Sequence, residues 1–318
     1  MMDWTDRHCR HFHRLLSPSA RLYTEMVHAH AVLRGDRQRL LGFSAIEHPV
    51  VLQLGGSDAG ELAEAARVGV EFGYDEINLN VGCPSDRVQA GRFGACLMRE
   101  PALVADCVAA MRAAVPVPVT VKCRIGVDDQ DSYADLERFV TVVAGAGVTV
   151  FLLHARKAWL HGLSPKQNRE VPPLDYERVF RLKQEHPALT VVLNGGITEA
   201  TAALAALERL DGVMIGRMAY HDPYQLTVLE RVLCDPVFEA PERAAVLAAF
   251  EPYAQAHLAR GETLNHLARH LVGLYQGQPG ARRYRRVLTE LSHRHGAGWE
   301  AVEAAISAQS QPPEARAA

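Results

Sequence analysis

Reactive and polar side chains recur where short hydrophobic runs of this sequence end. Cys83 follows one run in the segment NVGCP, and a glycine-rich segment, QAGRFGAC, comes after it. A buried cysteine is most often an inert, small hydrophobic residue. A Gly-Cys-Pro turn, however, holds a thiol in a fixed and partly exposed place. We therefore predict that Cys83 is functional and that the cysteines at positions 96, 107, 123 and 234 are structural.

Two glycine-containing segments follow later hydrophobic runs. Asn194-Gly195-Gly196 precedes a helical pattern, and Gly216-Arg217 follows the next run. Glycine lets the backbone approach a ligand closely, and N–H groups at a helix start attract anions. Arg217 can add a bidentate contact. These segments predict a phosphate site, with two ordinary tight turns as the alternative.

Lys122 and His154 stand at the ends of two further runs, and Gln53 stands near the end of an earlier one. A lysine in this place could form a Schiff base, contact a phosphate, contact a flavin, or serve as a salt-bridged structural residue. The residues alone leave these roles of Lys122 open.

The elements that must position these side chains alternate between β-rich and helical runs. The predicted strands are Leu22–Glu25, Val50–Leu54, Glu76–Asn80, Val119–Cys123, Val148–His154, Thr190–Asn194 and Gly212–Gly216. The predicted helices among them are Arg7–Leu16, Gly60–Phe72, Pro101–Ala113, Tyr133–Gly145, Leu174–Glu185 and Glu199–Leu207. Strand–helix repeats with nearly continuous hydrophobic strands indicate a parallel α/β fold. In a parallel barrel the carboxyl ends of the strands carry the function.

This pattern gives seven strands, whereas a closed barrel of this kind needs an eighth. Either the fold is open or the natural start lies upstream of Met1, and we expect the second. After Pro223 the strand signals stop, and the chain reads as helical to about Ile306. The last residues, QSQPPEARAA, read as a disordered tail.

The composition limits the classes of protein that this chain can belong to. Its 318 residues carry a net charge of −3 and a pI of about 6.6, whereas nucleic-acid binders are usually basic. We find no signal peptide and no apolar run that could span a membrane, and the cysteines are scattered. These features predict a reduced, cytoplasmic protein. The cluster HCRHFH at 8–13 does not place its ligands on one helix face, so no metal site is predicted.

Two basic segments could nevertheless contact phosphates. The loop at 161–174 carries Lys166, Asn168 and Arg169 and follows the run that ends at His154. The stretch at 260–294 holds seven arginines, Arg282 among them, and two glutamates. Basic residues on a rim are suited to contacts with a nucleic-acid backbone, although an ordinary solvated loop is the alternative.

Together these features resemble the tRNA-dihydrouridine synthases, specifically their A subfamily, over nearly the whole chain. The resemblance rests on segments that include LQLGG, YDEINLNVGCPSDRVQAGRFGACLM, VTVKCRIGVDD, FLLHARKAWLHGLSPKQNRE, LNGGI, VMIGRMAYHDPY and HLVGLYQGQPGARRYRR. The most specific of them is N-x-N-x-G-C-P followed by G-R-F-G-A-C-L-M.

The resemblance implies a (β/α)8 TIM barrel that binds FMN over residues 1–223, a helical tRNA-binding domain over 224–306, and a tail over 307–318. It implies NADPH as the reductant, with NADH as the alternative, and uridines 20 and 20a of the tRNA D-loop as the substrate. Separately, we expect a monomer. By matching positions, it implies that flavin is contacted by Met1, Gln53, Lys122 and His154, and that its phosphate is bound by Asn194, Gly195, Gly196, Gly216 and Arg217.

The same resemblance assigns chemistry to the thiol. Cys83 would donate a proton to the uracil ring, and Asn80 would contact the flipped base. Lys166, Asn168, Arg169 and Arg282 are the candidates for other tRNA contacts. Members of this family begin with a strand that lines the flavin, and of that region this sequence has only Met1-Met2-Asp3. The missing strand is the eighth one expected above.

Two other functions fit parts of the sequence. An FMN barrel enzyme acting on a small pyrimidine would share Lys122, the NGG segment and a cysteine acid, but it would not need the arginine-rich helices. A non-catalytic RNA-binding or scaffold protein would bind no flavin.

Overall fold

The computed structural model describes residues 1–311, except for the side chain of Arg87. Its internal contacts divide the chain into two compact units. The first comprises residues 1–2 and 21–216, and the second comprises residues 3–20 together with the residues from 217 onward. The segment 3–20 thus groups with the C-terminal helices. The predicted division into a catalytic and a tRNA-binding domain stays a prediction, because contacts alone assign no function.

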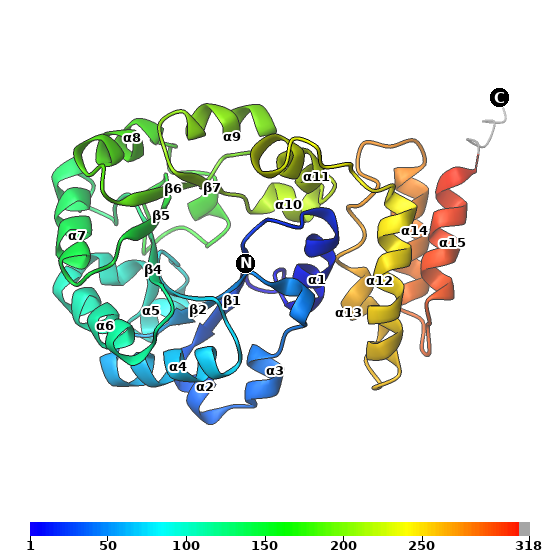
Figure 1. The fold of residues 1–318 in the computed structure, drawn as a ribbon, viewed down its shortest axis with the longest axis horizontal. Helices are drawn as coiled ribbons and strands as arrows, with labels where there is room; N and C mark the ends of the chain where they lie inside the picture. The colour runs from blue at the N-terminus through cyan, green and yellow to red at the C-terminus, as the bar shows by residue number, and fades with distance from the viewer. Residues whose placement is uncertain (312–318) are drawn as a thin grey trace. The chain divides into compact units, whose positions relative to one another are not determined.

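The first unit is built on a curled sheet of parallel strands, and Figure 1 shows how the strands turn about a common centre. Each strand pairs with its neighbour in chain order. The strands are β1 (Leu22–His28), β2 (Val50–Gly55), β3 (Glu76–Val81), β4 (Val119–Arg124), β5 (Val150–His154), β6 (Thr190–Asn194) and β7 (Gly212–Met214). The predicted parallel α/β class is therefore confirmed. The eighth strand and the closure of a barrel stay predictions.

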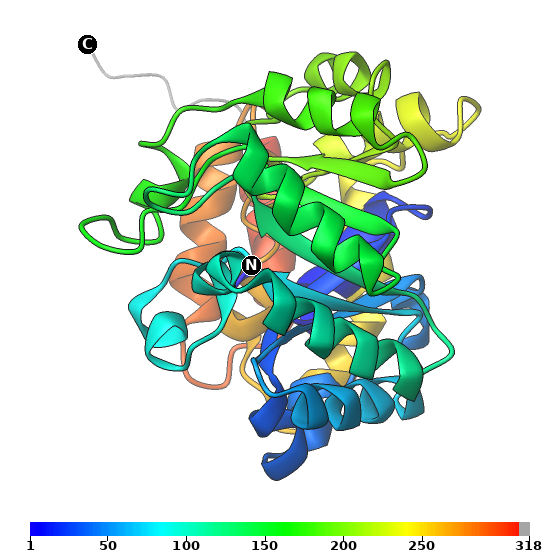
Figure 2. The same cartoon turned by 90° about the vertical axis from the view of Figure 1, so that its left-hand side faces the viewer.

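Helices lie on the outside of this sheet, as the side view in Figure 2 shows. The longer ones are α4 (Ala59–Glu71), α6 (Pro101–Ala114), α7 (Tyr133–Gly145), α8 (Tyr176–Glu185) and α9 (Ala200–Leu207). This unit also contains the shorter helices α2 (Ala29–Arg34), α3 (Arg37–Leu41), η1 (Ala45–Glu47), α5 (Asp86–Ala90), η2 (Gly94–Arg99) and η3 (Gln167–Arg169). Because the strands are covered in this way, all six residues of β2 are buried.

Two strands are shorter than predicted. The ladder between β5 and β6 begins where Val150 pairs with Thr190, so Val148 is buried but lies outside the ladder. At its carboxyl end, β6 stops at Asn194, and two glycines with positive φ follow it. With no further partner on β6, β7 ends at Met214 instead of Gly216.

The second unit consists of helices. They are α1 (Arg7–Leu16), α10 (Arg217–His221), α11 (Gln225–Leu229), the π-helix η4 (Glu230–Cys234), α12 (Arg243–Leu258), α13 (Leu264–Ala268), α14 (Ala281–Ser292) and α15 (Glu300–Ser310). Helix α14 packs against α15. Because α15 continues to Ser310, residues 307–310 do not belong to the predicted tail, and residues 312–318 lie outside the described part. None of the described helices combines the length and apolar character that crossing a membrane requires.

Candidate active site at the carboxyl ends of the strands

The strand register brings the predicted polar residues into one row. Asn80 of β3 pairs with Lys122 of β4, and two residues further on Arg124 pairs with His154 of β5. His154 in turn pairs with Asn194 of β6. Since side chains alternate between the two faces of a strand, Lys122 and Arg124 lie on the same face. The carboxyl ends of four neighbouring strands thus present a continuous polar row.

The turn that carries Cys83 is held by Asn80 and by the glycine-rich loop. The Asn80 Oδ1 atom accepts hydrogen bonds from the N–H groups of Gly82 and Cys83, both at 3.0 Å. From the other side, the Ala95 N–H donates to the Cys83 carbonyl at 2.9 Å. Gly94 has a φ of +75°, and a Cβ there would lie 2.5 Å from the Cys83 oxygen. The half-exposed thiol is therefore attached to a fixed backbone.

A chain of buried hydrogen bonds orients Asn80 itself. The Asn80 amide donates to Gln53 Oε1 at 2.8 Å, Gln53 donates to Asn78 at 2.9 Å, and Asn78 donates to Thr120 at 2.9 Å. Thr120 then donates to the Glu76 carboxylate at 2.6 Å. Buried polar groups that are mutually satisfied in this way fix one arrangement of side chains. We infer that this series of hydrogen bonds positions Cys83.

The sequence did not lead us to two members of this series of hydrogen bonds, Glu76 and Thr120. The signal was present, because Glu76 opens a strand in which Ile77, Leu79 and Val81 alternate with polar residues, and it is only 2% exposed. An ionised residue in such a place needs partners. Arg21 supplies a charged one at 2.6 Å. The side-chain amides of Gln53 and Asn80 already form hydrogen bonds within this series, and their predicted contacts with flavin and uracil stay predictions.

Arg124 ties the Cys83 turn to the loop that follows β5. Its guanidinium donates to the carbonyls of Gly82, Lys157 and Asn168 at 2.9–3.0 Å and is almost fully buried. Burial lowers the pKa of Arg124 to about 10, so the group remains charged at neutral pH. Because these donors are bonded to carbonyls, the main role of Arg124 is to hold the Cys83 turn and the loop after β5 together.

Asn168 is the second anchor of that loop. Its side chain has no exposed surface and accepts from the Trp159 N–H at 2.8 Å, while its amide donates to the Trp159 and Leu163 carbonyls. In this structure the buried Asn168 positions the loop, and its predicted RNA contact stays a prediction. Lys166 and Arg169, on the same loop, are exposed.

The site is strongly electropositive. Burial holds the pKa of His154 well below its usual value, and the positive charges of Arg124, Lys122, Arg156 and Arg169 lower it further. His154 is therefore a neutral imidazole at pH 7. A row of cations around a buried neutral ring attracts an anionic group.

Lys122 is the half-buried cation of this row. Burial lowers its pKa from 10.5 to about 8, and the charge of Arg124 acts in the same direction. Lys122 pairs across the strands with Asn80, whose side chain holds the Cys83 turn. At pH 7 the ammonium is mostly protonated and can stabilise negative charge beside Cys83.

The Asn194-Gly195-Gly196 segment fits a ligand that approaches the backbone. Gly195 and Gly196 have φ values of +104° and +73°, which side chains rarely allow. A Cβ on Gly195 would lie 2.4 Å from the His154 ring, and one on Gly196 would lie 2.7 Å from the Tyr176 hydroxyl. The absence of side chains at both positions therefore lets His154, Leu174 and Tyr176 pack directly against this backbone.

The remaining predicted phosphate and flavin residues lie as follows. Asn194 donates to the Met214 carbonyl at 2.9 Å and so joins the ends of β6 and β7. A Cβ on Gly216 would lie 3.4 Å from the Met1 sulfur, so these two residues are neighbours in the first unit. Arg217 opens α10 and belongs to the second unit. The binding roles of Met1, Gly216 and Arg217 stay predictions.

Arg282 lies on an exposed basic face of α14. Arg282 and Arg286 are both exposed and one helical turn apart, whereas Tyr284 and Leu288 on the other side are buried. Arg283 instead donates to the Ala308 carbonyl of α15 at 3.0 Å. A surface hollow of about 880 Å³ begins at this helix end and is lined by residues 276–283, 285 and 309–311.

Comparison with known proteins agrees with this geometry. A family model described as "Dihydrouridine synthase (Dus)" matches residues 1–310. A protein named tRNA-dihydrouridine(20/20a) synthase from Xanthomonas campestris is 66% identical over 307 residues, which cover 96% of this chain and 90% of the relative. Proteins of the same name from Xylella fastidiosa and Vibrio cholerae are 60% and 54% identical, again over 96% of this chain and over 92% and 94% of their own lengths.

Proposed function

The chain belongs to the dihydrouridine synthase family, and on that premise we propose that it reduces the C5=C6 bond of uridines 20 and 20a in the D-loop of tRNA, using FMN and NADPH. The names of its relatives support the choice of these two uridines. NADH is the alternative reductant. We further propose that the curled sheet forms a (β/α)8 barrel and that the enzyme acts as a cytoplasmic monomer.

The observation that carries this proposal is the fixed Cys83 turn beside Lys122. Two backbone N–H groups of the turn bond to Asn80, and Asn80 pairs with Lys122 on the neighbouring strand. A thiol and a cation held together at the carboxyl ends of parallel strands supply a proton donor and a stabiliser of negative charge.

The residues of the site fit FMN. Gly195 and Gly196, with positive φ and no side chains, would form a backbone cradle for a phosphate beside His154, and the cations around His154 match the charge of a phosphate-bearing cofactor. Lys122 and His154, with Gln53 and Met1, would hold the ring system, and Asn194, the two glycines, Gly216 and Arg217 would hold the phosphate. When bound and reduced by NADPH, FMN supplies a hydride to C6 of the uracil.

This chain's own residues complete the reduction. As C6 gains the hydride, the electron pair of the C5=C6 bond moves to C5 and the C4 carbonyl oxygen. Cys83 then donates the thiol proton to C5 from the opposite face, and the resulting thiolate takes up a proton from water. Lys122 stabilises the charge that develops on the oxygen, because the guanidinium of Arg124 is already engaged on three carbonyls.

The substrate base must leave its stack to reach such a site. We propose that exposed cations hold the RNA backbone while the base enters. Lys166 and Arg169 on the loop after β5 and Arg282 on α14 are the candidates. In this arrangement residues 224–306 serve as the tRNA-binding domain and residues 1–223 as the catalytic domain.

A reconstituted reaction tests the proposal. Purified protein, FMN and NADPH are incubated with unmodified tRNA, and dihydrouridine at each position is measured by mass spectrometry. We expect dihydrouridine at positions 20 and 20a and no reduction of free uracil. Reduction of the free base without change in tRNA would instead identify a small-pyrimidine oxidoreductase, and protein that retains no flavin would refute a flavoenzyme.

A further inference from the structure

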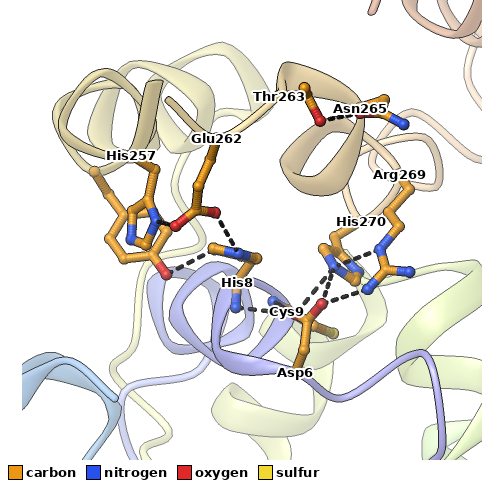
Figure 3. Close-up of polar contacts among 10 residues, drawn as sticks. Asp6, His8, Cys9, His257, Glu262, Thr263, Asn265, Arg269 and His270 are labelled. Atoms are coloured by element: carbon orange, nitrogen blue, oxygen red, sulfur yellow. Dashed lines mark hydrogen bonds and ion pairs between the residues drawn. The ribbon is translucent and has the colours of Figure 1, made fainter. Parts of the chain in front are cut away.

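The helical unit brings two histidines and a glutamate together from distant parts of the sequence. His8 lies in the first turn of α1, His257 in the last turn of α12, and Glu262 shortly after it (Figure 3). His8 Nε2 lies 3.2 Å from one Glu262 carboxylate oxygen, and His257 Nδ1 lies 2.6 Å from the other. The three ligating atoms are all within 4.8 Å of one another.

The local backbone structure orients the side chains of His8 and Glu262. The Asp6 carboxylate caps α1 by accepting from the N–H groups of His8 and Cys9, which fixes the turn that carries His8. After α12, Gly261 adopts a φ of +87° and the Glu262 N–H donates to the His257 carbonyl at 3.2 Å. This left-handed turn bends the chain back, so that Glu262 faces His257.

The two imidazoles are fixed before any ligand arrives. His8 and His257 are only 8% and 5% exposed. The second ring nitrogen of His8, Nδ1, is hydrogen-bonded to the Tyr253 hydroxyl at 2.9 Å, which leaves Nε2 directed at Glu262. Metal-bound histidines commonly use their other nitrogen in this way. The Glu262 side chain is 34% exposed and gives ions and water a route in.

We propose that His8 Nε2, His257 Nδ1 and the Glu262 carboxylate form a binding site for a divalent first-row cation, zinc above all, with water as the fourth ligand. Two imidazoles and a carboxylate are ligands that zinc accepts, and tetrahedral zinc spaces them about 3.4 Å apart at bonds of about 2.1 Å. The observed separations require only small side-chain shifts. The cation replaces two N–H···O hydrogen bonds with three coordinate bonds.

The neighbouring polar cluster does not compete for the ion. There the Asp6 carboxylate is paired with both Arg269 and His270, the latter at 3.0 Å (Figure 3). The guanidinium already neutralises Asp6, whereas the principal polar contacts of Glu262 are the two imidazoles. A cation at Glu262 would join α1 to the end of α12, two helices already in contact, and would therefore stabilise this unit.

Equilibrium dialysis of the full chain, stripped with EDTA and then exposed to zinc chloride, tests the site. We expect one zinc bound per wild-type chain, a higher Tm in its presence, and the visible bands of tetrahedral cobalt when cobalt replaces it. Glu262→Gln preserves an acceptor for His257 but removes the carboxylate charge. It should keep a similar zinc-free Tm and lose at least about tenfold in zinc affinity.

His266→Ala, which removes an exposed histidine outside the cluster, is the matched control and should bind zinc like the wild type. Absence of zinc uptake by the wild-type chain would overturn the proposal. Equal zinc affinity of Glu262→Gln and wild type would also overturn it, because the ion would then sit elsewhere, for example on thiols.

Discussion

Replacing Lys122 with methionine should make the ligand-free protein more stable and at the same time less able to hold flavin. The structure lowers the pKa of Lys122 from 10.5 to about 8, mainly through burial. Each pKa unit corresponds to about 1.4 kcal/mol, so holding this ammonium charged in the folded state costs roughly 3 kcal/mol at pH 7. Methionine has a similar length and carries no charge that must be buried.

The pH dependence of this cost has a definite sign. Between pH 8 and 10.5 the unfolded chain keeps the Lys122 proton and the folded protein releases it, so wild-type stability rises with pH in this window. Below pH 8 the cost is present in full, and above 10.5 it is gone. The stability advantage of Lys122→Met should therefore be largest at neutral pH and should decline across the window.

Urea unfolding of ligand-free wild type and Lys122→Met at several pH values from 7 to 10.5 measures this difference directly. Lys166→Met, at an exposed position, is the control and should differ from wild type by a small, pH-independent amount. A Lys122→Met variant that is less stable than wild type at pH 7, or a difference that does not change with pH, would refute the assigned burial cost.

Two further predictions concern the ligand contacts. Gly195→Ala places a Cβ 2.4 Å from the His154 ring at a φ of +104°, so the purified variant should retain much less FMN, measured by absorbance. The control Gly145→Ala, whose Cβ meets nothing within 4 Å, should retain FMN normally. Equal FMN retention by the two variants would contradict the proposed cradle. Arg282→Ala combined with Arg286→Ala should weaken tRNA binding and leave NADPH oxidation unchanged. The dependence of log binding constant on log salt concentration should become less steep by about one per lost phosphate contact. An unaltered tRNA Kd would show that α14 takes no part in tRNA recognition.

The strands were predictable because parallel strands covered on both faces are nearly continuous apolar runs. β6 lies where it was predicted, and the remaining strands differ by a few residues at their ends. Function at the carboxyl ends stays a prediction, drawn from runs that end in polar residues such as Asn80, His154 and Asn194. The end of β7 was not predictable, because it depends on the partner strand stopping before Gly195.

Hydrogen bonds made across the fold could not be derived from local patterns. The sequence marks Asn80 and Asn168 as polar residues at functional positions, but it does not reveal that their amides are engaged by backbone groups. Helix α1 illustrates the same limit: its bounds, Arg7–Leu16, were predicted, yet nothing in its periodicity indicated that His8 would face His257.

The most direct test of the mechanism compares Cys83→Ala with Cys96→Ala, which removes a half-exposed thiol of the glycine-rich segment that follows Cys83. Flavin content, NADPH oxidation and dihydrouridine in tRNA are measured for both. We expect Cys83→Ala to keep its flavin and oxidise NADPH but to form dihydrouridine at least about 100-fold more slowly, as expected for loss of a general acid. Cys96→Ala should remain active. Dihydrouridine formation by Cys83→Ala at the wild-type rate would contradict the assignment of Cys83 as the proton donor.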